Sequence, residues 1–403
     1  MNKDQKPNPA TLIVETGSGG HRHLHVRKLC LQLWSAENRH PDHVWWFLSA
    51  QVAEQVLALL DPRIASVLKS RIHIAPPSAP LRDVFAAAQS TGAGQVFFLE
   101  IDEYIYDLAL RPLPFTVSGV WFRVNFHYRH FGIPQESFAQ TLKAFLKRLM
   151  LLRLCARRNI RALLVLDKTA ADYARTSPRI AKLAHVPDPV GFPSLAGDRQ
   201  PRDPASKRYV IAIVGAISRR KGVLTVLQAL EGLGPECQEK LELRIVGRSA
   251  KPERDEIAAA VQRARDLTRV HVFHEDAFVS DEQIDRELAG ADLNLLLYQR
   301  FVGSSGVLIR SALHARPVLA TKFGLIGYLV EQNRLGVTAD PYSSAQVAAA
   351  LQLALENPVA NFDAAGAAEF AVGHSPDVYA QRLAAIVLNH TSLPKASSSI
   401  AAA

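Results

Sequence analysis

Short apolar runs alternate with longer amphipathic stretches along almost the whole chain. The runs are rich in Val, Ile and Leu and are expected to form buried strands, whereas the stretches between them have helical periodicity. This alternation is typical of parallel sheets whose strands are joined by crossover helices. In the first half the expected strands are Thr11–Glu15, Val44–Leu48, Val96–Leu99, Val117–Asn125 and Leu163–Leu166. In the second half they are Tyr209–Val214, Leu241–Val246, Arg269–Phe273, Leu293–Leu297 and Pro317–Thr321.

The length of the chain predicts two domains. Its 403 residues exceed the roughly 250–300 residues at which a single hydrophobic core stops growing. Residues 192–208 are rich in Pro, Gly, Asp and Ser and form the expected linker. We therefore expect an α/β protein with two doubly wound, Rossmann-like domains, residues 1–191 and 209–372. A closing helix within 373–390 and a disordered tail, 391–403, complete the predicted organisation.

Composition excludes several classes of protein. Apolar residues make up 48% and charged residues 21% of the chain, which is typical of globular proteins and not of disordered, collagenous or coiled-coil ones. No uncharged apolar stretch reaches the roughly 18 residues of a membrane span, and the N-terminus shows no apolar signal region, so we expect a cytoplasmic protein. Cys30, Cys155 and Cys237 form no CxxC pair, which favours reduced, packed thiols.

The net charge of +9 comes from the first half of the chain alone. Residues 1–200 contain 25 Lys and Arg against 16 Asp and Glu, whereas residues 201–403 contain 22 of each kind. A nucleic-acid-binding protein would usually be basic throughout and would carry a recognition module, and none is visible. The uneven charge instead indicates an enzyme with one half near an anionic surface.

The loop after strand Tyr209–Val214 combines glycine with three cations. It contains Gly215, then Arg219-Arg220-Lys221-Gly222, and it leads into an amphipathic helix, Val223–Leu233. Backbone N–H groups, the helix dipole and neighbouring cations at a helix start favour an anion, and this set suits a diphosphate. A solvated basic turn is an equally open interpretation of the three cations. The glycines match neither GxGxxG nor a Walker loop, so those fingerprints are absent.

A second loop follows strand Leu293–Leu297. It begins at Tyr298, ends in Gly303-Ser304-Ser305-Gly306 and leads into the expected helix Val307–His314. Small residues permit close backbone approach, so Ser304 and the amides of Ser305, Gly306 and Val307 are candidates to bind a phosphate. The alternative is a flexible turn in which a serine caps the helix. Both loops follow strands of one sheet, at the edge where ligands bind in open α/β folds.

Further segments occur in a recognisable order along the chain. They are Gly19-Gly20-His21, Phe126-His127-Tyr128, His185-Val186-Pro187-Asp188-Pro189-Val190, Arg220-Lys221-Gly222 and Pro317-Val318-Leu319-Ala320-Thr321. In this order they resemble the nucleotide-sugar glycosyltransferases of the GT-B fold, particularly the retaining family 4. In the same order, the family elements that they resemble are the glycine-rich first loop, the active-site histidine segment, the I-P-N-G-V element, the E-K-G segment and the P-V-V-A-S strand.

This resemblance, which extends piecewise over nearly the whole chain, implies a GT-B architecture with the two domains facing across a cleft. It implies that Gly19 and Gly20 approach the donor diphosphate or the acceptor. It implies that His127 is the active-site histidine and that Lys221 holds the donor phosphate. The segment from His271 to Val279 is similar to the base-binding loop, so backbone near Val279 is a candidate contact of the nucleobase.

Three positions depart from the family pattern. Ala216 stands where an arginine is common, and Arg219 or Arg220 would then replace it. The paired glutamates that would contact the donor sugar and ribose fall on Val302 and Arg310. Phosphate binding is therefore better supported than the sugar contacts or the retaining outcome. For Arg310 we favour an ion pair with a structural carboxylate over contact with an acidic group of the donor.

Acid–base candidates lie in the first domain. His127 sits between two aromatic residues, and a packed, hydrogen-bonded core histidine is as good an interpretation as a base or a group that orients the transferred sugar. Glu15, Asp102, Glu103 and Asp107 are the other candidates, and the middle two follow a strand where an acceptor hydroxyl could bind. The alternative is that these carboxylates are structural residues at helix starts, where the helix dipole favours them.

No metal site is expected. His21, His23 and His25 are spaced by two residues, and such positions point about 200° apart on a helix, so His21 and His23 do not share a face. No acidic pair of the DxD kind follows a strand near the phosphate loops. We therefore expect a metal-independent transferase with no bound cofactor.

The segment from Lys143 to Arg161 places seven cations beside an apolar stripe at helical spacing. A basic amphipathic helix can lie on an anionic membrane surface, with its leucines buried and its cations extended to the headgroups. The alternative, which we favour, is an ordinary helix packed on the first sheet through Leu146, Leu149, Met150 and Leu154. Contact with the inner face of a membrane stays a hypothesis.

The predicted function is transfer of a sugar from a nucleotide sugar to a hydroxyl acceptor, in polysaccharide or glycolipid synthesis. A lipid-linked or polysaccharide intermediate is the acceptor that we consider first. The alternative is a degenerate GT-B protein, without turnover, that binds a glycan or a partner. An epimerase or phosphorylase on the same fold lacks visible support, because neither the required acid–base groups nor a pyridoxal lysine is apparent. The base, sugar, acceptor and stereochemical outcome are left open.

Overall fold

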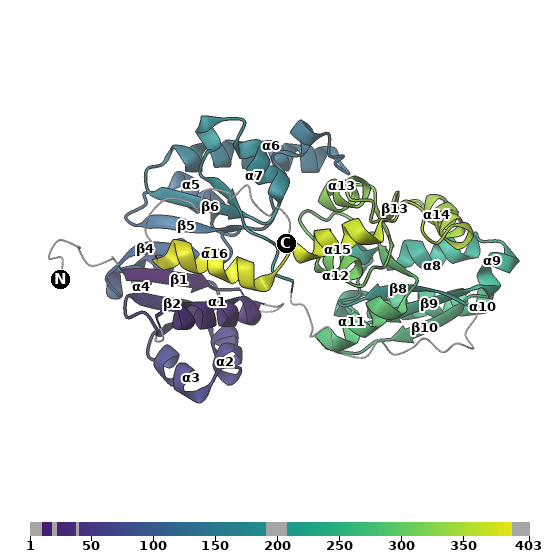
Figure 1. The fold of residues 1–403 in the computed structure, drawn as a ribbon, viewed down its shortest axis with the longest axis horizontal. Coiled ribbons are helices and arrows are strands. Elements are labelled where there is room, and N and C mark those ends of the chain that lie inside the picture. Colours follow the sequence, from purple (N-terminus) through teal and green to yellow (C-terminus); the bar gives the residue numbers. More distant parts are fainter. Residues whose placement is uncertain (1–9, 18–21, 38–39, 191–207, 389–403) are drawn as a thin grey trace. The chain divides into compact units, whose positions relative to one another are not determined.

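The computed structural model describes residues 10–17, 22–37, 40–190 and 208–388, and these form two compact units. The first unit comprises the described residues of Met1–His127, Leu142–Pro189 and Pro376–Ala403. The second comprises those of Tyr128–Thr141 and Val190–Ser375. Each unit has a parallel sheet with helices on its faces (Figure 1), as the alternating pattern predicts. The predicted tail lies outside the described residues, as does the linker except for Arg208.

The first unit has a parallel sheet with the order β3-β2-β1-β4-β5-β6-β7. Its strands are β1 Ala10–Glu15, β2 Val44–Ser49, β3 Ile72–Ala75, β4 Ala93–Phe98, β5 Thr116–Trp121, β6 Ile160–Val165 and β7 Leu183–His185. Its helices are α1 Arg22–Glu37, α2 Ala50–Ala58, α3 Pro62–Lys69, α4 Leu81–Ser90, α5 Ile105–Leu110, most of α6 Phe138–Ala156, α7 Lys168–Ala174 and α16 Pro376–Leu388. Leu12, Ile13 and Val14 of β1 are all buried, because helices cover both faces of a parallel sheet.

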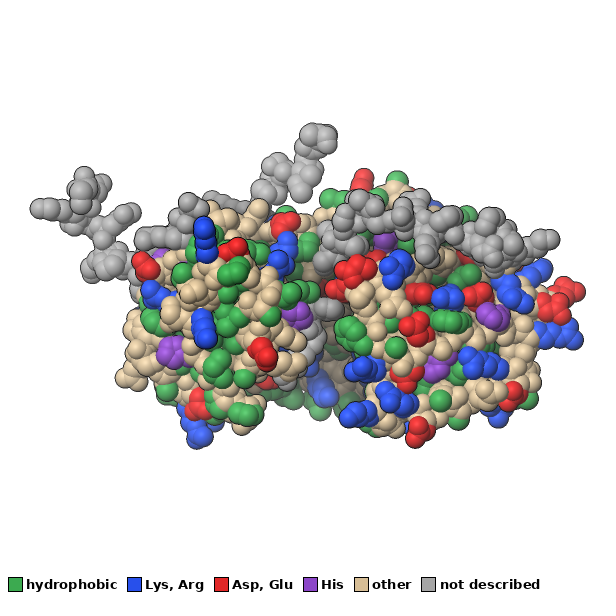
Figure 2. Space-filling model, turned by 90° about the horizontal axis from the view of Figure 1, so that it is seen from below, with side chains coloured by type: hydrophobic (Ala, Val, Ile, Leu, Met, Phe, Trp, Pro, Cys, Tyr) green, Lys and Arg blue, Asp and Glu red, His purple; other side chains and the backbone are tan. Residues whose placement is uncertain are grey.

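The second unit has a parallel sheet with the order β10-β9-β8-β11-β12-β13. Its strands are β8 Tyr209–Val214, β9 Leu241–Val246, β10 His271–Glu275, β11 Leu293–Leu296, β12 Val318–Thr321 and β13 Gly336–Ala339. Its helices are α8 Val223–Glu231, α9 Pro235–Glu239, α10 Arg254–Leu267, α11 Asp281–Gly290, α12 Gly306–Leu313, α13 Gly324–Gln332, α14 Ser344–Glu356 and α15 Ala364–Val372. Figure 2 shows Lys and Arg side chains among Asp and Glu over this unit, on the right, in line with its balanced charge.

The strand order reverses once in each sheet. In the first unit the reversal lies between β1 and β4, and in the second it lies between β8 and β11. The register confirms these central positions, since Ile13 pairs with both Trp46 and Phe97. Ligands of open α/β sheets bind at such switch points, beyond the carboxyl ends of the two diverging strands. Functional residues are therefore expected in the loops after β1, β4, β8 and β11.

Two segments join a unit other than their sequence neighbours. Residues 128–141, which the sequence places in the first domain, group with the second unit, and α16 groups with the first. The closing helix is buried there through Tyr379 and Leu383, which share one core cluster with Leu29 and Leu33 of α1.

One predicted strand and the predicted basic helix extend four residues or more beyond their observed ends. Strand Val117–Asn125 ends at Trp121, because the carboxylate of Asp102 accepts the amides of Phe122 and Arg123 at 2.8 and 3.0 Å and draws them from the sheet. The basic helix ends at Ala156, since the chain then enters β6 in register with β5. The last three of its seven predicted cations, from Arg157 to Arg161, therefore lie outside α6.

None of the helices in the described part of the chain is long and apolar enough to cross a membrane. The three cysteines are all described and all unpaired; Cys30 and Cys155 are buried.

Candidate functional site

The loops after β8, β9 and β10 are joined by backbone hydrogen bonds at the carboxyl edge of the second sheet. Gly215 N–H donates to Val246 O, and Gly247 N–H donates to Glu275 O, at 3.0 and 2.9 Å. Gly247 has φ +143°, and a Cβ there would overlap the backbone oxygen of Gly215. Glycine at 247 thus lets the first two loops lie directly against each other.

The three cations predicted to bind phosphate extend from this edge toward different partners. Arg219 turns to α10, where its Nε donates to Glu256 at 2.7 Å, and its amide donates to Glu253. Lys221 is only 6% exposed, and its Nζ donates to Val214 O. A lysine ammonium carries three donors, so this one bond does not exhaust it. The exposed side chain of Arg220 reaches the neighbouring loop, and Lys221 Nζ also lies over Tyr298 of that loop, 5.6 Å from the ring centroid.

The loop after β11 lies against the loop after β8. The amide of Gln299 donates to Arg220 O at 2.7 Å, and the Arg220 guanidinium lies over the rings of Tyr298 and Phe301, 5.5 and 5.1 Å from their centroids. A Cβ on Gly222, whose φ is +72°, would overlap the backbone oxygen of Leu297. The two segments predicted to bind one diphosphate are therefore side by side at the switch point.

Tyr298 and the serines have clear structural positions in this second loop. Tyr298 is buried and packs edge-on against Phe301, at 5.2 Å between ring centroids, so its ring belongs to the core. Ser305 is the N-cap of α12, and its Oγ accepts the amide of Leu308 at 3.4 Å, as the capping interpretation predicts. Gly303 has φ +121°, a conformation that requires glycine.

The start of α12 stays accessible. Gly306 is exposed, and Ser304 and Val307 are half-buried. Because the first amides of a helix have no partner within it, this helix start can accept an anion.

Two of the three positions that depart from the family pattern, Arg310 and Val302, have structural partners. Arg310 is 8% exposed and binds Asp281 and Asp285 of α11, at 2.9 and 3.2 Å. Asp285 also meets His314 Nε2 at 3.2 Å. Arg310 therefore ties α12 to α11, which is the structural role favoured from the sequence. Val302 packs against an apolar cluster that contains Tyr128. This apolar environment suits a valine better than the glutamate of the family pattern.

The predicted base-binding loop follows β10. Asp276 accepts the amide of Ser249 at 2.7 Å and pairs with Arg254 at 2.9 Å, which fixes the loop to its neighbour. Val279 is 8% exposed, whereas Phe278 before it is 74% exposed. The side chain of Val279 thus packs inward, and a nucleobase contact by its backbone stays a prediction.

His127 is fully buried in the first unit. Its Nε2 lies 2.7 Å from Asp167 Oδ2 and 2.9 Å from Thr169 Oγ1, and its exposed fraction is 0%. Asp167 also accepts the amide of Thr169 as the N-cap of α7. This is the packed, hydrogen-bonded alternative from the sequence analysis, and direct contact of His127 with a substrate stays a prediction.

At the first unit's switch point, two carboxylates have internal partners. Glu15 binds Arg22 at 2.6 Å and accepts the amide of Gly17; burial raises the pKa of Glu15. Burial likewise raises the pKa of Asp102, which holds the two amides beyond β5. The predicted Gly19 and Gly20 of this loop lie outside the described residues.

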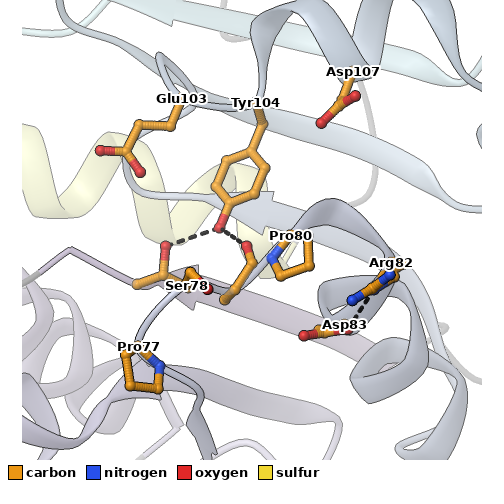
Figure 3. Close-up of a pocket in the computed structure, with 10 residues that line it drawn as sticks. Pro77, Ser78, Pro80, Arg82, Asp83, Glu103, Tyr104 and Asp107 are labelled. Atoms are coloured by element: carbon orange, nitrogen blue, oxygen red, sulfur yellow. Dashed lines mark hydrogen bonds and ion pairs between the residues drawn. The ribbon is translucent and has the colours of Figure 1, made fainter.

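A cavity of about 370 Å³ opens beside the same switch point (Figure 3). The Tyr104 hydroxyl donates to Ala79 O at 2.8 Å and lies 2.9 Å from Thr16 Oγ1. Glu103 and Asp107 flank Tyr104 in the cavity wall, and Asp83 lies across from them next to Arg82. Sequence reasoning identified Glu103 and Asp107 but missed Tyr104, whose position depends on the loop at Ala79.

No group of three or more His, Cys, Asp or Glu side chains within the described ranges is arranged to hold a metal ion.

Helix α6 exposes an apolar stripe. Leu142, Phe145, Leu146 and Leu149 are 48%, 57%, 41% and 42% exposed. The buried residues of the helix lie on the opposite face, at about 100° per residue; they are Ala144, Leu151, Leu154 and Cys155. The prediction that Leu146 and Leu149 belong to the core is wrong, Met150 is half-buried, and Leu154 is buried as expected.

Cations flank this stripe. At about 100° per residue, Lys143 and Arg148 fall on opposite sides of the exposed leucines, and both are exposed. Arg153 is held near the helix end by a bond of 2.7 Å from its Nε to Ala109 O.

Comparison with known proteins finds a family match over most of the second unit. Residues 197–368 match the family model of glycosyl transferases group 1. The search of curated proteins found no match. Among solved structures, Anabaena HepE in complex with UDP and glucose is 15% identical, with coverage of 95% of this chain and 100% of HepE and a TM-score of 0.60. Sucrose-phosphate synthase from Thermosynechococcus elongatus is 16% identical, with coverage of 95% and 99% and a TM-score of 0.64.

A third similar structure is WaaG, a glycosyltransferase involved in lipopolysaccharide biosynthesis. It is 16% identical, with coverage of 94% of this chain and 99% of WaaG and a TM-score of 0.60. At such low identity these likenesses show the fold, which is GT-B, as predicted.

Proposed function

We propose that this chain, whose residues 197–368 match the family model of glycosyl transferases group 1, moves a sugar from a nucleoside-diphosphate sugar to a hydroxyl acceptor. The observation that carries the proposal is the backbone bond from Gln299 to Arg220 O, which joins the two predicted phosphate loops at the switch point of the second sheet. HepE, which has the same fold, binds UDP and glucose.

The donor diphosphate is held by the second unit. Arg220 offers an exposed side chain, Lys221 offers a buried ammonium, and residues 304–307 offer backbone amides at the start of α12. When the bond between the anomeric carbon and the diphosphate oxygen breaks, negative charge grows on the leaving diphosphate. Donors already in place stabilise that charge without reorganisation. The reaction then needs no metal ion or cofactor, because side-chain cations and amides neutralise the leaving group.

The acceptor is held by the first unit. The cavity beside Tyr104 combines a tyrosine hydroxyl with the carboxylates of Glu103 and Asp107, which suit the hydroxyl groups of a sugar. A carboxylate there accepts the proton that the acceptor oxygen releases as it bonds to the anomeric carbon. The proposal does not depend on His127, whose imidazole faces Asp167.

The acceptor is lipid-linked or part of a polysaccharide, and the enzyme works at an anionic membrane surface. The exposed stripe of α6 would enter the interface, and Lys143 and Arg148 would reach lipid phosphates on either side of it. The cytoplasmic leaflet supplies such anionic lipids. The positive excess of residues 1–200 favours the same partner.

Nucleotide binding tests the donor site. A ligand that binds the native state raises its melting point, so thermal shifts with UDP, GDP, ADP and TDP should identify one preferred nucleotide. Nucleotide sugars with that base should then be consumed in the presence of an acceptor extract, with release of the nucleotide. A shift without any turnover would favour the degenerate binding protein. If none of the four nucleotides stabilises the protein, the donor site is wrong.

A further inference from the structure

A segment that follows β5 and includes the first turn of α6 belongs to the second unit. This strap, residues 128–141, groups by its contacts with that unit. Ile133 is buried against Leu325 of α13, and Pro134 O accepts the amide of Gly324 at 2.8 Å. The strap is thus anchored beside the loop that follows β11.

The carboxylate of Glu136 binds this loop. Both of its oxygens accept the amide of Arg300, at 2.7 and 3.0 Å. Two more donors hold the same carboxylate, since Gln140 Nε2 lies 3.0 Å and the Tyr342 hydroxyl 3.4 Å from Oε2. Arg300 has φ +52°, a left-handed conformation that is unfavourable for a residue with a side chain. An external acceptor on its amide therefore helps to keep this turn in place, together with the Gln299 side chain, which donates to Pro341 O at 2.7 Å.

The turn at Arg300 supports the exposed phosphate cation. Gln299, the residue before it, donates to the backbone of Arg220, and Phe301, the residue after it, lies under the Arg220 guanidinium. If the Arg300 amide were released, both supports would shift together. Glu136 thus acts on Arg220 through the main chain of the loop.

We infer that Glu136 is a positioning residue of the nucleotide-diphosphate site, supplied by a strap from the first half of the chain. It binds no ligand itself. It holds residues 298–301 in the conformation that directs Arg220 toward a diphosphate. This inference rests on the proposed function for its ligand, but the structural part can be tested without any ligand.

Hydrogen–deuterium exchange of the free protein tests the loop. In Glu136→Ala, amides in residues 297–306 should exchange about tenfold faster, as expected when a bond to a charged acceptor is lost. Glu136→Gln keeps an acceptor oxygen and should restore most of the protection. The matched control is Glu356→Ala, because Glu356 also bonds a glutamine one turn away, Gln352, at 2.9 Å, but on the exposed face of α14. In the Glu356→Ala variant, the amides of residues 297–306 should exchange at the wild-type rate.

Nucleotide affinity tests the consequence. With whichever of UDP, GDP, ADP and TDP stabilises the wild type, Glu136→Ala should raise Kd about tenfold, lower kcat/KM by at least as much, and keep the melting point near that of Glu356→Ala. Unchanged exchange in 297–306, or a Gln variant as unprotected as the Ala variant, would overturn the inference. Faster exchange with unchanged affinity would overturn the link to Arg220. If no nucleotide binds the wild type, the proposed function fails, and the exchange result still decides the role of Glu136.

Discussion

The two units share one sheet topology but differ in chemistry where the strand order reverses. In the second unit this point carries Arg220, Lys221 and glycine-rich loops pressed together. In the first unit it carries carboxylates, with Glu103 and Asp107 in a cavity. The first unit is nevertheless the basic half of the chain, so its positive excess lies elsewhere, in part on α6. The fold provides two equivalent places, and the loops give one of them cations and the other carboxylates, as the proposed donor and acceptor sites require.

The largest expected effect is a difference in activity between variants of two cations in the loop after β8, Lys221 and Arg219. Lys221→Ala should lower kcat/KM by about 100- to 1000-fold, because it removes an ammonium that stabilises the leaving diphosphate. Arg219→Ala is the matched control, since its guanidinium is held by Glu256 at 2.7 Å, and it should lose less than about threefold. Steady-state kinetics with the preferred donor, together with melting curves, measure both. Equal losses for the two variants would contradict the assignment to Lys221.

Alanine substitutions at two glycines test how tightly the loops after β8 and β11 are packed. Gly222 and Gly92 have φ of +72° and +65°, but a Cβ would strike Leu297 O at Gly222 and meet nothing within 4 Å at Gly92. In both variants the left-handed backbone is unfavourable for alanine and lowers the free energy of unfolding by about 1 kcal/mol. Gly222→Ala should lose roughly 3 kcal/mol of unfolding free energy in total, since the loops must also separate. Urea denaturation gives both values, and equal losses would show that the loops are not in tight contact.

Acid should destabilise the first unit through His40. Burial lowers the pKa of His40 to about 4, and its Nε2 accepts Trp46 Nε1 at 3.0 Å. An unfolded histidine titrates near 6.5. The unfolded state therefore binds a proton before the folded state does, and stability is lost as the pH falls from about 6.5 toward 4. The loss should be roughly 2–3 kcal/mol.

The control for this pH dependence is His40→Gln, which keeps an acceptor for Trp46 but does not titrate. Its unfolding free energy should be flatter between pH 6.5 and 4 than that of the wild type. A wild-type slope that persists in the variant would assign the acid sensitivity to other groups, such as His274 in the second unit, whose pKa burial also lowers.

The sequence predicted the centre of both sheets but missed three strands. These are β3, β7 and β13, each at a sheet edge and four residues long or shorter. An edge strand pairs on one side only and needs no continuous apolar run, so its pattern is weak. The central strands are buried on both faces and have the long Val, Ile and Leu runs that reveal them.

The candidate site divides in the same way. Local sequence located the two loops that we propose to bind phosphate, because glycines and cations after a strand are visible in a few consecutive residues. The direction of each side chain depends on distant partners, such as Glu256 for Arg219 and Asp281 for Arg310. The strap was missed for the same reason, since nothing near Glu136 indicates that it meets Arg300.

The smallest expected effect concerns the surface of the first unit. Phe145→Ser with Leu149→Ser on α6 should weaken binding to vesicles rich in phosphatidylglycerol by about tenfold, because two exposed apolar side chains no longer enter the interface. Lys143→Glu with Arg148→Glu should weaken it as well and remove the preference over pure phosphatidylcholine. The matched control lies in the second unit, where Leu353 of α14 is 45% exposed but has no cation on its helix. Leu353→Ser should float with vesicles like the wild type. Wild-type protein that shows no preference for anionic vesicles would assign the stripe of α6 to another partner and leave the basic half of the chain without its proposed surface.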